Sequence, residues 1–243
     1  IYLRRFLQET PVFKKMRESK ALAKFPLEEV VKTSRFGIWI SMFITWVLTG
    51  CIVVFILLMP GFVGGVLGFS PFETTYFQMG GLVCIVSSCW LTGRLADKHN
   101  PSTLCILFSA GFAVSSVAFF SLLYTAAPVV SEVVLAYFAT CFFAGIMNFC
   151  PIFMCDVFPA RIRFSGISFA YNIAYALSGA FTPQLSFALH AYAKTHPDTL
   201  GAMGLSAYIV FLALVSIGTA LAMRRVYENG GAAVSQMEFR PAP

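Results

Sequence analysis

The stretch LVCIVSSCWLTGRLADKHNPSTLCILFSAGFAVSSVAFF, residues 82–120, holds two long apolar runs separated by a charged turn. The turn, GRLADKH at 93–99, places an arginine, an aspartate, a lysine and a histidine within six positions. Apolar runs of this length are typical of helices that cross the hydrocarbon core of a bilayer. The stretch therefore predicts two membrane-spanning helices joined by a turn that lies in water.

The composition of the whole chain supports this interpretation. It is 58% hydrophobic and only 12% charged, with a mean hydropathy of +0.78, whereas soluble domains carry about 25% charged residues. We therefore expect an all-α membrane protein with a cytoplasmic segment over 1–35, a transmembrane unit over 36–223 and a cytoplasmic tail over 224–243. Six apolar segments provide the expected transmembrane helices: 36–60, 72–95, 103–124, 132–155, 165–192 and 204–223.

The basic residues predict the orientation of these helices. Sixteen of the seventeen lysines and arginines fall on the side that holds both chain ends, and only Lys194 falls on the other. By the positive-inside rule, both ends are expected in the cytoplasm. In the leading segment, Thr10 and Pro11 favour the start of an amphipathic helix, and PLEEVVKTS at 26–34 predicts a second short helix. Because the basic residues are dispersed beside the membrane, we expect lipid and not nucleic acid as their partner.

The remaining polar residues give little reason to expect a metal or cofactor. All seven cysteines lie in apolar spans, with no CxxC pair and no nearby pair of histidines, so small buried thiols are expected and a metal site is not. Glu73 and Glu132 stand at the starts of spans, where a carboxylate suits the positive end of the helix dipole. Spans without a charge at their centre also leave no obvious catalytic group.

Three motifs resemble those of a known transporter family. GRLADK at 93–98 resembles the G-x-L-A-D-[RK] motif of the major facilitator superfamily, found at the turns between helices two and three and between helices eight and nine. LRRFLQETPVF at 3–13 and DVFPARIRFSGISFAYN at 156–172 resemble segments of its metabolite:proton symporter family, which includes proline/betaine, shikimate and dicarboxylate carriers. The motif at 93–98 continues with HNPS and lacks the usual glycine and basic residues, as in the second copy. The resemblance covers essentially the whole chain and implies the C-terminal six-helix half of the fold.

The resemblance also implies a cytoplasmic charge network that changes between conformations. Gly93 is expected to allow close helix packing, and Asp97 to pair with a helix start or an arginine. Asp156, Arg161 and Arg163 are expected to pair with Asp97 and Arg94 or with the other half of the transporter. The alternative is an ordinary solvated turn with orienting charges. The full set of expected network residues is Gly93, Arg94, Asp97, Lys98, Asp156, Arg161 and Arg163.

Substrate contacts are expected on helices seven, eight, ten and eleven, which line the cavity in this superfamily. Their polar and aromatic residues are costly in lipid unless they face the interior of the bundle, and the alternative role for each is a hydrogen bond between helices. Asn148 precedes Pro151, which removes a helical hydrogen bond, and bends are expected at Pro151, Gly179 and Pro183. The candidate substrate contacts are Trp46, Gln78, Asn148, Tyr171, Asn172, Tyr175 and Gln184.

The expected function is secondary active transport of a small organic solute, a carboxylate, amino acid or betaine, by alternating access with proton symport. The chain begins at Ile1 and carries no charged residue deep in a span, so we expect the proton-carrying carboxylate in a preceding N-terminal half. A multi-pass location in a bacterial inner membrane follows from the resemblance. One alternative is a receptor or channel without coupled transport. An intramembrane hydrolase is the remote alternative, because RFSG has Arg163 where the nucleophile turn needs glycine, and His190 falls on the same span.

Overall fold

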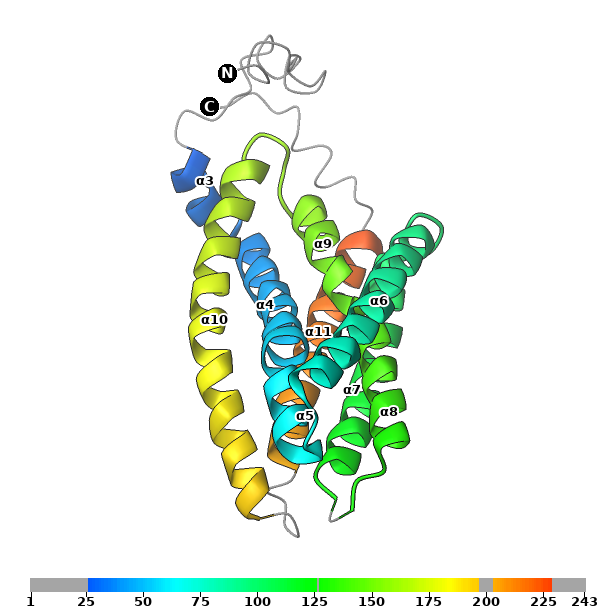
Figure 1. The fold of residues 1–243 in the computed structure, drawn as a ribbon. Helices are drawn as coiled ribbons and strands as arrows, with labels where there is room; N and C mark the ends of the chain where they lie inside the picture. The colour runs from blue at the N-terminus through cyan, green and yellow to red at the C-terminus, as the bar shows by residue number, and fades with distance from the viewer. Residues whose placement is uncertain (1–25, 126, 197–202, 229–243) are drawn as a thin grey trace, which may run out of the picture.

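The computed structural model describes residues 26–125, 127–196 and 203–228, and the described part is entirely helical. The amphipathic helix expected from Thr10 and most of the expected tail lie outside the described residues. Figure 1 shows long helices running side by side along one bundle axis. In chain order the elements are α3 (Pro26–Thr33), α4 (Arg35–Cys51), η1 (Ile52–Leu58), α5 (Met59–Leu67), α6 (Pro71–Ala96), α7 (Pro101–Leu123), α8 (Val130–Phe143), η2 (Ala144–Asn148), α9 (Phe149–Val157), α10 (Arg163–Thr195) and α11 (Gly204–Glu228).

The prediction of an all-α, multi-pass membrane protein is confirmed. Five helical segments of the described part are long and apolar enough to cross a membrane: 35–67, 71–96, 101–123, 130–157 and 204–228. The helix over the predicted fifth span, α10, is not among them, although its 33 residues run beside α4 along the bundle (Figure 1). Its polar side chains lower its hydropathy, and several of them belong to the candidate functional site.

Short connections between the helices follow from local sequence signals. α5 ends at Gly68, whose φ of 68° is the left-handed conformation that glycine adopts at little cost. The first helix therefore runs seven residues beyond the predicted span end at position 60. Ser70 and Glu73 then form a capping box at the start of α6, as expected for Glu73. At the other end of α6, the charged turn closes at Asn100, whose side chain accepts a hydrogen bond of 2.9 Å from the Ser102 N–H.

Two apolar cores fill the bundle. One lies toward the end that holds α5 and contains the aromatic side chains of Phe55, Phe112, Phe119 and Tyr137. The other lies toward α3 and contains Phe149, Phe153 and Phe158, packed beside α4 and α11. α4 is central to the arrangement, because it contacts α9, α10 and α11.

Cysteine burial follows the prediction in most positions. Cys51, Cys105, Cys141 and Cys150 are buried, and Cys84 and Cys89 are half-buried. Cys155 is exposed, so the expectation that every thiol is buried is wrong at that residue.

Close helix packing occurs at several glycines, including Gly145, but not at Gly93. A Cβ added at Gly93 would lie 3.5 Å from Nδ2 of Asn148, which is an ordinary contact. A Cβ added at Gly145 would clash with Oγ of Ser88 and lie 3.0 Å from Cβ of that residue, so η2 and α6 approach closely there. The small residues that this approach requires are therefore Gly145 and Ser88.

We expect Gly145→Ala to lower the melting temperature of the full-length protein in detergent, because overpacking costs about 1–3 kcal/mol. Adding Ser88→Gly should recover much of the loss by removing the atoms that clash. Gly218→Ala is the matched control, since no described atom lies within 4 Å of a Cβ added at this position of α11, and it should leave the melting temperature unchanged or raise it. Equal effects at Gly145 and Gly218 would contradict close packing between η2 and α6.

Candidate functional site

The first long helix is interrupted near its middle by a π-helical stretch, η1 (Ile52–Leu58), and Pro60 lies two residues after its end. A return from π-helical to α-helical bonding leaves one carbonyl without a main-chain donor. Proline has no N–H and leaves a second carbonyl unbonded. Both groups need a donor from elsewhere, because unsatisfied backbone groups are costly inside a membrane.

Two side chains from neighbouring helices supply those donors. Gln78 of α6 donates from Nε2 to the Ile56 carbonyl at 2.8 Å. Tyr137 of α8 donates from its hydroxyl to the Phe55 carbonyl at 2.9 Å. Gln78, a candidate substrate contact, therefore bonds the backbone of the interrupted helix. Neither the role of Tyr137 nor the π-helix was predicted from the sequence. Pro60, just after the π-helix, is the sequence signal from which an interruption could have been predicted.

Asn148 also bonds a neighbouring helix. It ends the 3₁₀ stretch η2, three residues before Pro151, where an irregular helix was expected. Its Nδ2 donates to the Cys89 carbonyl and to Oγ1 of Thr92, each at 3.2 Å. Asn148 thus joins η2 to α6, which is the interhelical role expected as the alternative to substrate binding.

Trp46 belongs to a hydrogen-bonded chain that joins three helices. Its Nε1 donates to the Tyr208 hydroxyl of α11 at 3.2 Å, and that oxygen lies 2.7 Å from Oγ1 of Thr182 on α10. Phe181 packs edge-on against the Trp46 ring, with the centroids 6.0 Å apart. Thr182 and Tyr208 are buried, so the chain holds α10 against α4 and α11 near Pro183. Bends were expected at Gly179 and Pro183, and α10 continues through both residues as a single α-helix.

α10 presents a polar, aromatic face in its first half. Tyr171 and Tyr175 stack with their centroids 5.5 Å apart, and Asn172 is exposed beside them. Nδ2 of Asn172 donates to the Ser168 carbonyl of the same helix at 2.7 Å, which leaves the amide oxygen and one N–H available. Gln184 follows Tyr175 by nine residues, which is about two and a half helical turns, so it projects from the opposite side of the helix to Tyr175. The structure brings three candidates together here: Tyr171, Asn172 and Tyr175.

A second polar contact lies at the far end of α10. Nδ1 of His190 is 2.5 Å from the Tyr124 hydroxyl of α7, and the imidazole stacks on Phe62 at a centroid distance of 4.0 Å. The contact joins α5, α7 and α10. Ser165 and His190 are 25 positions apart on the same helix, or about 38 Å along its axis. His190 is therefore out of reach of Ser165 as a general base, which counts against a hydrolase.

The charged end of the bundle is held by partners that the sequence did not indicate. Arg161 forms an ion pair with Glu29 of α3, and both side chains are about four-fifths buried, with 18% and 20% exposed. Asp156 accepts a hydrogen bond of 2.6 Å from the Tyr227 hydroxyl of α11. These contacts attach the end of α11 to the end of α9, and α3 to the segment between α9 and α10.

The expected pairing of these groups with the turn at 93–99 does not occur within the part of the chain that the structure describes. Arg94 lies over the Trp90 ring of its own helix at 4.1 Å, a cation–π contact. Asp97 and Lys98 are exposed, and neither forms an ion pair with another described residue. Nε of Arg163 donates to the Phe158 carbonyl at 3.1 Å. A state-dependent role for the turn therefore requires a partner beyond these helices.

Known proteins similar to this chain share its transmembrane character. The family model described as Major Facilitator Superfamily matches residues 2–183. The inner membrane metabolite transport protein YhjE of Escherichia coli (strain K12) is 27% identical to this chain over 243 aligned residues. That alignment covers 94% of this chain and 51% of the relative, so the chain spans about half of the relative's length. No solved structure matches the chain.

We expect Gln78→Leu to destabilise the full-length protein by about 1–3 kcal/mol, because the Ile56 carbonyl loses its donor in an apolar setting. Adding Pro60→Ala should recover stability, since alanine restores a backbone N–H at the interruption. Gln184→Leu is the matched control on an exposed site. Melting temperatures in detergent would compare the three variants with the unaltered protein, and a loss of stability that Pro60→Ala fails to reduce would contradict the assigned role of Gln78.

We expect Glu29→Gln to loosen α3 by removing the carboxylate that Arg161 contacts. Hydrogen exchange of the α3 amides should become faster, while Glu28→Gln should have little effect. Glu28 is an exposed neighbour whose pKa is lowered by the hydrogen bond from Lys32 within α3, and ion pairs that are exposed to solvent contribute little to stability. Swapping the two charges, with Glu29→Arg and Arg161→Glu together, should restore the protection of the α3 amides. Equal rates of hydrogen exchange in the Glu29→Gln and Glu28→Gln variants would count against the ion pair.

Proposed function

Because the chain belongs to the Major Facilitator Superfamily, we propose that it forms the C-terminal six-helix half of a secondary active transporter. The transporter moves a small organic solute by alternating access, with two six-helix halves rocking around a site near the midplane. In this proposal α10 also crosses the membrane, as the fifth of six spans in chain order, and completes the six-helix half. A bacterial inner membrane and cytoplasmic chain ends are part of the proposal, supported by the YhjE relative and by the distribution of basic residues.

The observation that carries the proposal is the exposed polar face of α10. A helix surrounded by lipid or apolar neighbours needs apolar side chains, yet α10 exposes Asn172 and Tyr175 in its first half. The same face carries Tyr171, and among the described residues neither tyrosine hydroxyl has a hydrogen-bond partner. Such a face is stable in a membrane where it meets water or a solute, as in the cavity of a transporter.

The chemistry of this face fits a solute that carries both charge and apolar groups. Stacked tyrosine rings attract ammonium or quaternary ammonium groups through their π faces. The phenol hydroxyls and the Asn172 amide can donate hydrogen bonds to a carboxylate. An amino acid or a betaine combines both features, and a simple carboxylate would use the donors alone.

Proton coupling is assigned to the other half of the transporter. The six predicted spans carry Asp, Glu, Lys or Arg only at their ends, as with Glu73, Arg94 and Glu132. A proton-coupled site needs a group that titrates within the membrane, and a carboxylate in the preceding six helices would supply it. The cytoplasmic partner that Asp97 lacks among the described residues is placed in the same half.

The experiment is uptake of labelled amino acids, betaines and carboxylates by the full-length protein in liposomes, with and without a pH gradient. We expect uptake of one of these classes to rise when the lumen is alkaline and to fall when a protonophore is added. Asn172→Ala should raise KM about tenfold, the effect of losing about 1.4 kcal/mol of binding. Gln184→Ala should raise KM much less than Asn172→Ala does.

Three outcomes would overturn parts of the proposal. Uptake that does not respond to the gradient would remove proton coupling while leaving transport in place. Solute binding without uptake would show a receptor. Equal loss of affinity from the Asn172 and Gln184 variants would contradict the α10 face as the binding surface.

A further inference from the structure

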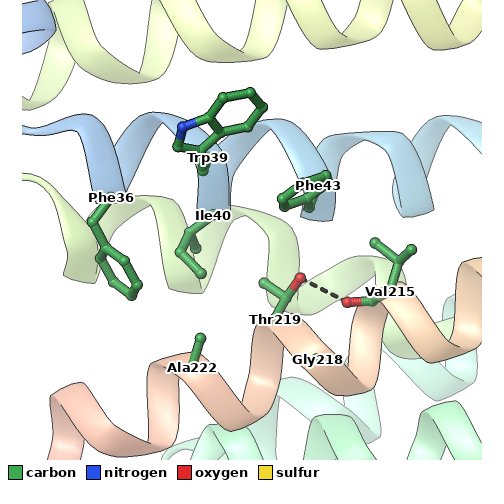
Figure 2. Close-up of a pocket in the computed structure, with 8 residues that line it drawn as sticks. All are labelled: Phe36, Trp39, Ile40, Phe43, Val215, Gly218, Thr219 and Ala222. Atoms are coloured by element: carbon green, nitrogen blue, oxygen red, sulfur yellow. Dashed lines mark hydrogen bonds between the residues drawn. The ribbon is translucent and has the colours of Figure 1, made fainter.

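An apolar groove runs between α4 and α11 at the end of the bundle where α4 begins. Its volume is about 380 Å³. Figure 2 shows the aromatic side chains of α4 on one side and the small residues of α11 on the other. The lining residues are Phe36, Trp39, Ile40, Phe43, Val215, Gly218, Thr219 and Ala222.

The groove is open to whatever surrounds the bundle. The side chains of Phe36, Trp39 and Phe43 are 49%, 58% and 43% exposed. At Gly218 no described atom lies within 4 Å of an added Cβ, so the side formed by α11 is also uncovered. Both helices are candidate membrane spans, and an open apolar groove between such spans faces acyl chains.

Arginines stand beside the groove at its end. Arg35 is the first residue of α4, directly before Phe36 and one helical turn before Trp39. Arg225 follows Ala222 by three residues, which places it near the same side of α11. Both arginines are exposed, and neither pairs with an acidic residue in the described part of the chain. The neighbouring Arg224 differs, because its Nε donates to Glu228 at 2.7 Å.

We propose that this groove is a binding site for an anionic glycerophospholipid. One acyl chain lies along Phe36, Trp39 and Phe43, over the small residues of α11, and the lipid phosphate lies between Arg35 and Arg225. Guanidinium groups bind phosphate through charge-assisted hydrogen bonds, and tryptophan is favoured at the level of lipid headgroups. A second copy of the chain fits less well, since a two-fold contact along this groove would bring like-charged arginines together. The inference rests on membrane placement alone and is independent of transport.

The test uses the full-length protein with every tryptophan except Trp39 replaced by phenylalanine, in phosphatidylcholine vesicles. Brominated phosphatidylglycerol or brominated phosphatidylcholine is added as a minor component, and quenching of Trp39 fluorescence reports which lipid occupies the groove. We expect phosphatidylglycerol to quench at lower mole fractions than phosphatidylcholine. Arg35→Gln and Arg225→Gln should each reduce that preference about fivefold, the effect of about 1 kcal/mol per basic residue.

Two further variants separate a built site from general surface charge. Arg224→Gln removes the same charge one residue away and should leave the preference unchanged. Gly218→Leu keeps both arginines but fills the groove, and it should abolish the preference. A preference that survives Gly218→Leu, or that falls equally in Arg224→Gln and Arg225→Gln, would overturn the proposal.

Native mass spectrometry of the protein with its tryptophans intact provides a second measurement, should the tryptophan replacements impair folding. Retained phosphatidylglycerol should be reduced by Arg225→Gln and kept by Arg224→Gln. Equal quenching by both lipids, or a disulfide between two Gly218→Cys chains in place of lipid, would also show that the proposal is wrong.

Discussion

Backbone groups that lose their helical partners constrain this bundle more than any other feature. Within a membrane, such groups must be satisfied by the protein itself. The interruption at η1 and Pro60 would leave carbonyls unbonded, and Gln78 and Tyr137 bond the carbonyls of Ile56 and Phe55. The first helix is thereby fixed to α6 and α8 at its interruption. Asn148 has a similar role between η2 and α6, so side chains that look like solute ligands in the sequence hold irregular helices together.

The π-helical stretch and Pro60 also change how many main-chain hydrogen bonds stiffen the first helix. A continuous α-helix resists bending because each turn is bonded to the next, whereas a π-helical stretch followed by proline has fewer bonds to break. The bonds at the interruption come from side chains on other helices, Gln78 of α6 and Tyr137 of α8. The interruption lies beside the aromatic core of Phe55, Phe112 and Phe119, which keeps the surrounding helices closely packed. The first helix therefore has fewer main-chain hydrogen bonds at this point than in the α-helical segments on either side.

Hydropathy and local signals account for most of the fold that could be predicted. The apolar runs place the long helices, and residues such as Glu73 and Asn100 mark where they begin. The first helix extends past the predicted end because seven apolar and glycine residues after Pro60 remain helical until Gly68. The π-helix was not predicted, since periodicity does not distinguish one inserted residue in a run that is apolar on every side.

Partners across the bundle were the least predictable part of the candidate site. Arg161 and Asp156 were predicted to belong to a charge network, but their contacts with Glu29 and Tyr227 join positions 132 and 71 residues apart. Nothing in a local motif indicates such pairs. By contrast, Tyr171, Asn172 and Tyr175 were found together because they are close in the chain and share one helix face. Local grouping is therefore a better guide to this site than residue type alone.

The low hydropathy of α10 follows from the same physical rule as the bonded carbonyls. A polar group in a membrane protein must meet a protein partner or water. Gln78, Asn148 and Trp46 have protein partners on neighbouring helices, and they are at least half-buried. Asn172 and Tyr175 are exposed, and among the described residues they have bonding capacity left over, which fits the cavity-lining role proposed for this face. The property that keeps α10 from resembling an ordinary membrane span is thus the property that a cavity-lining helix requires.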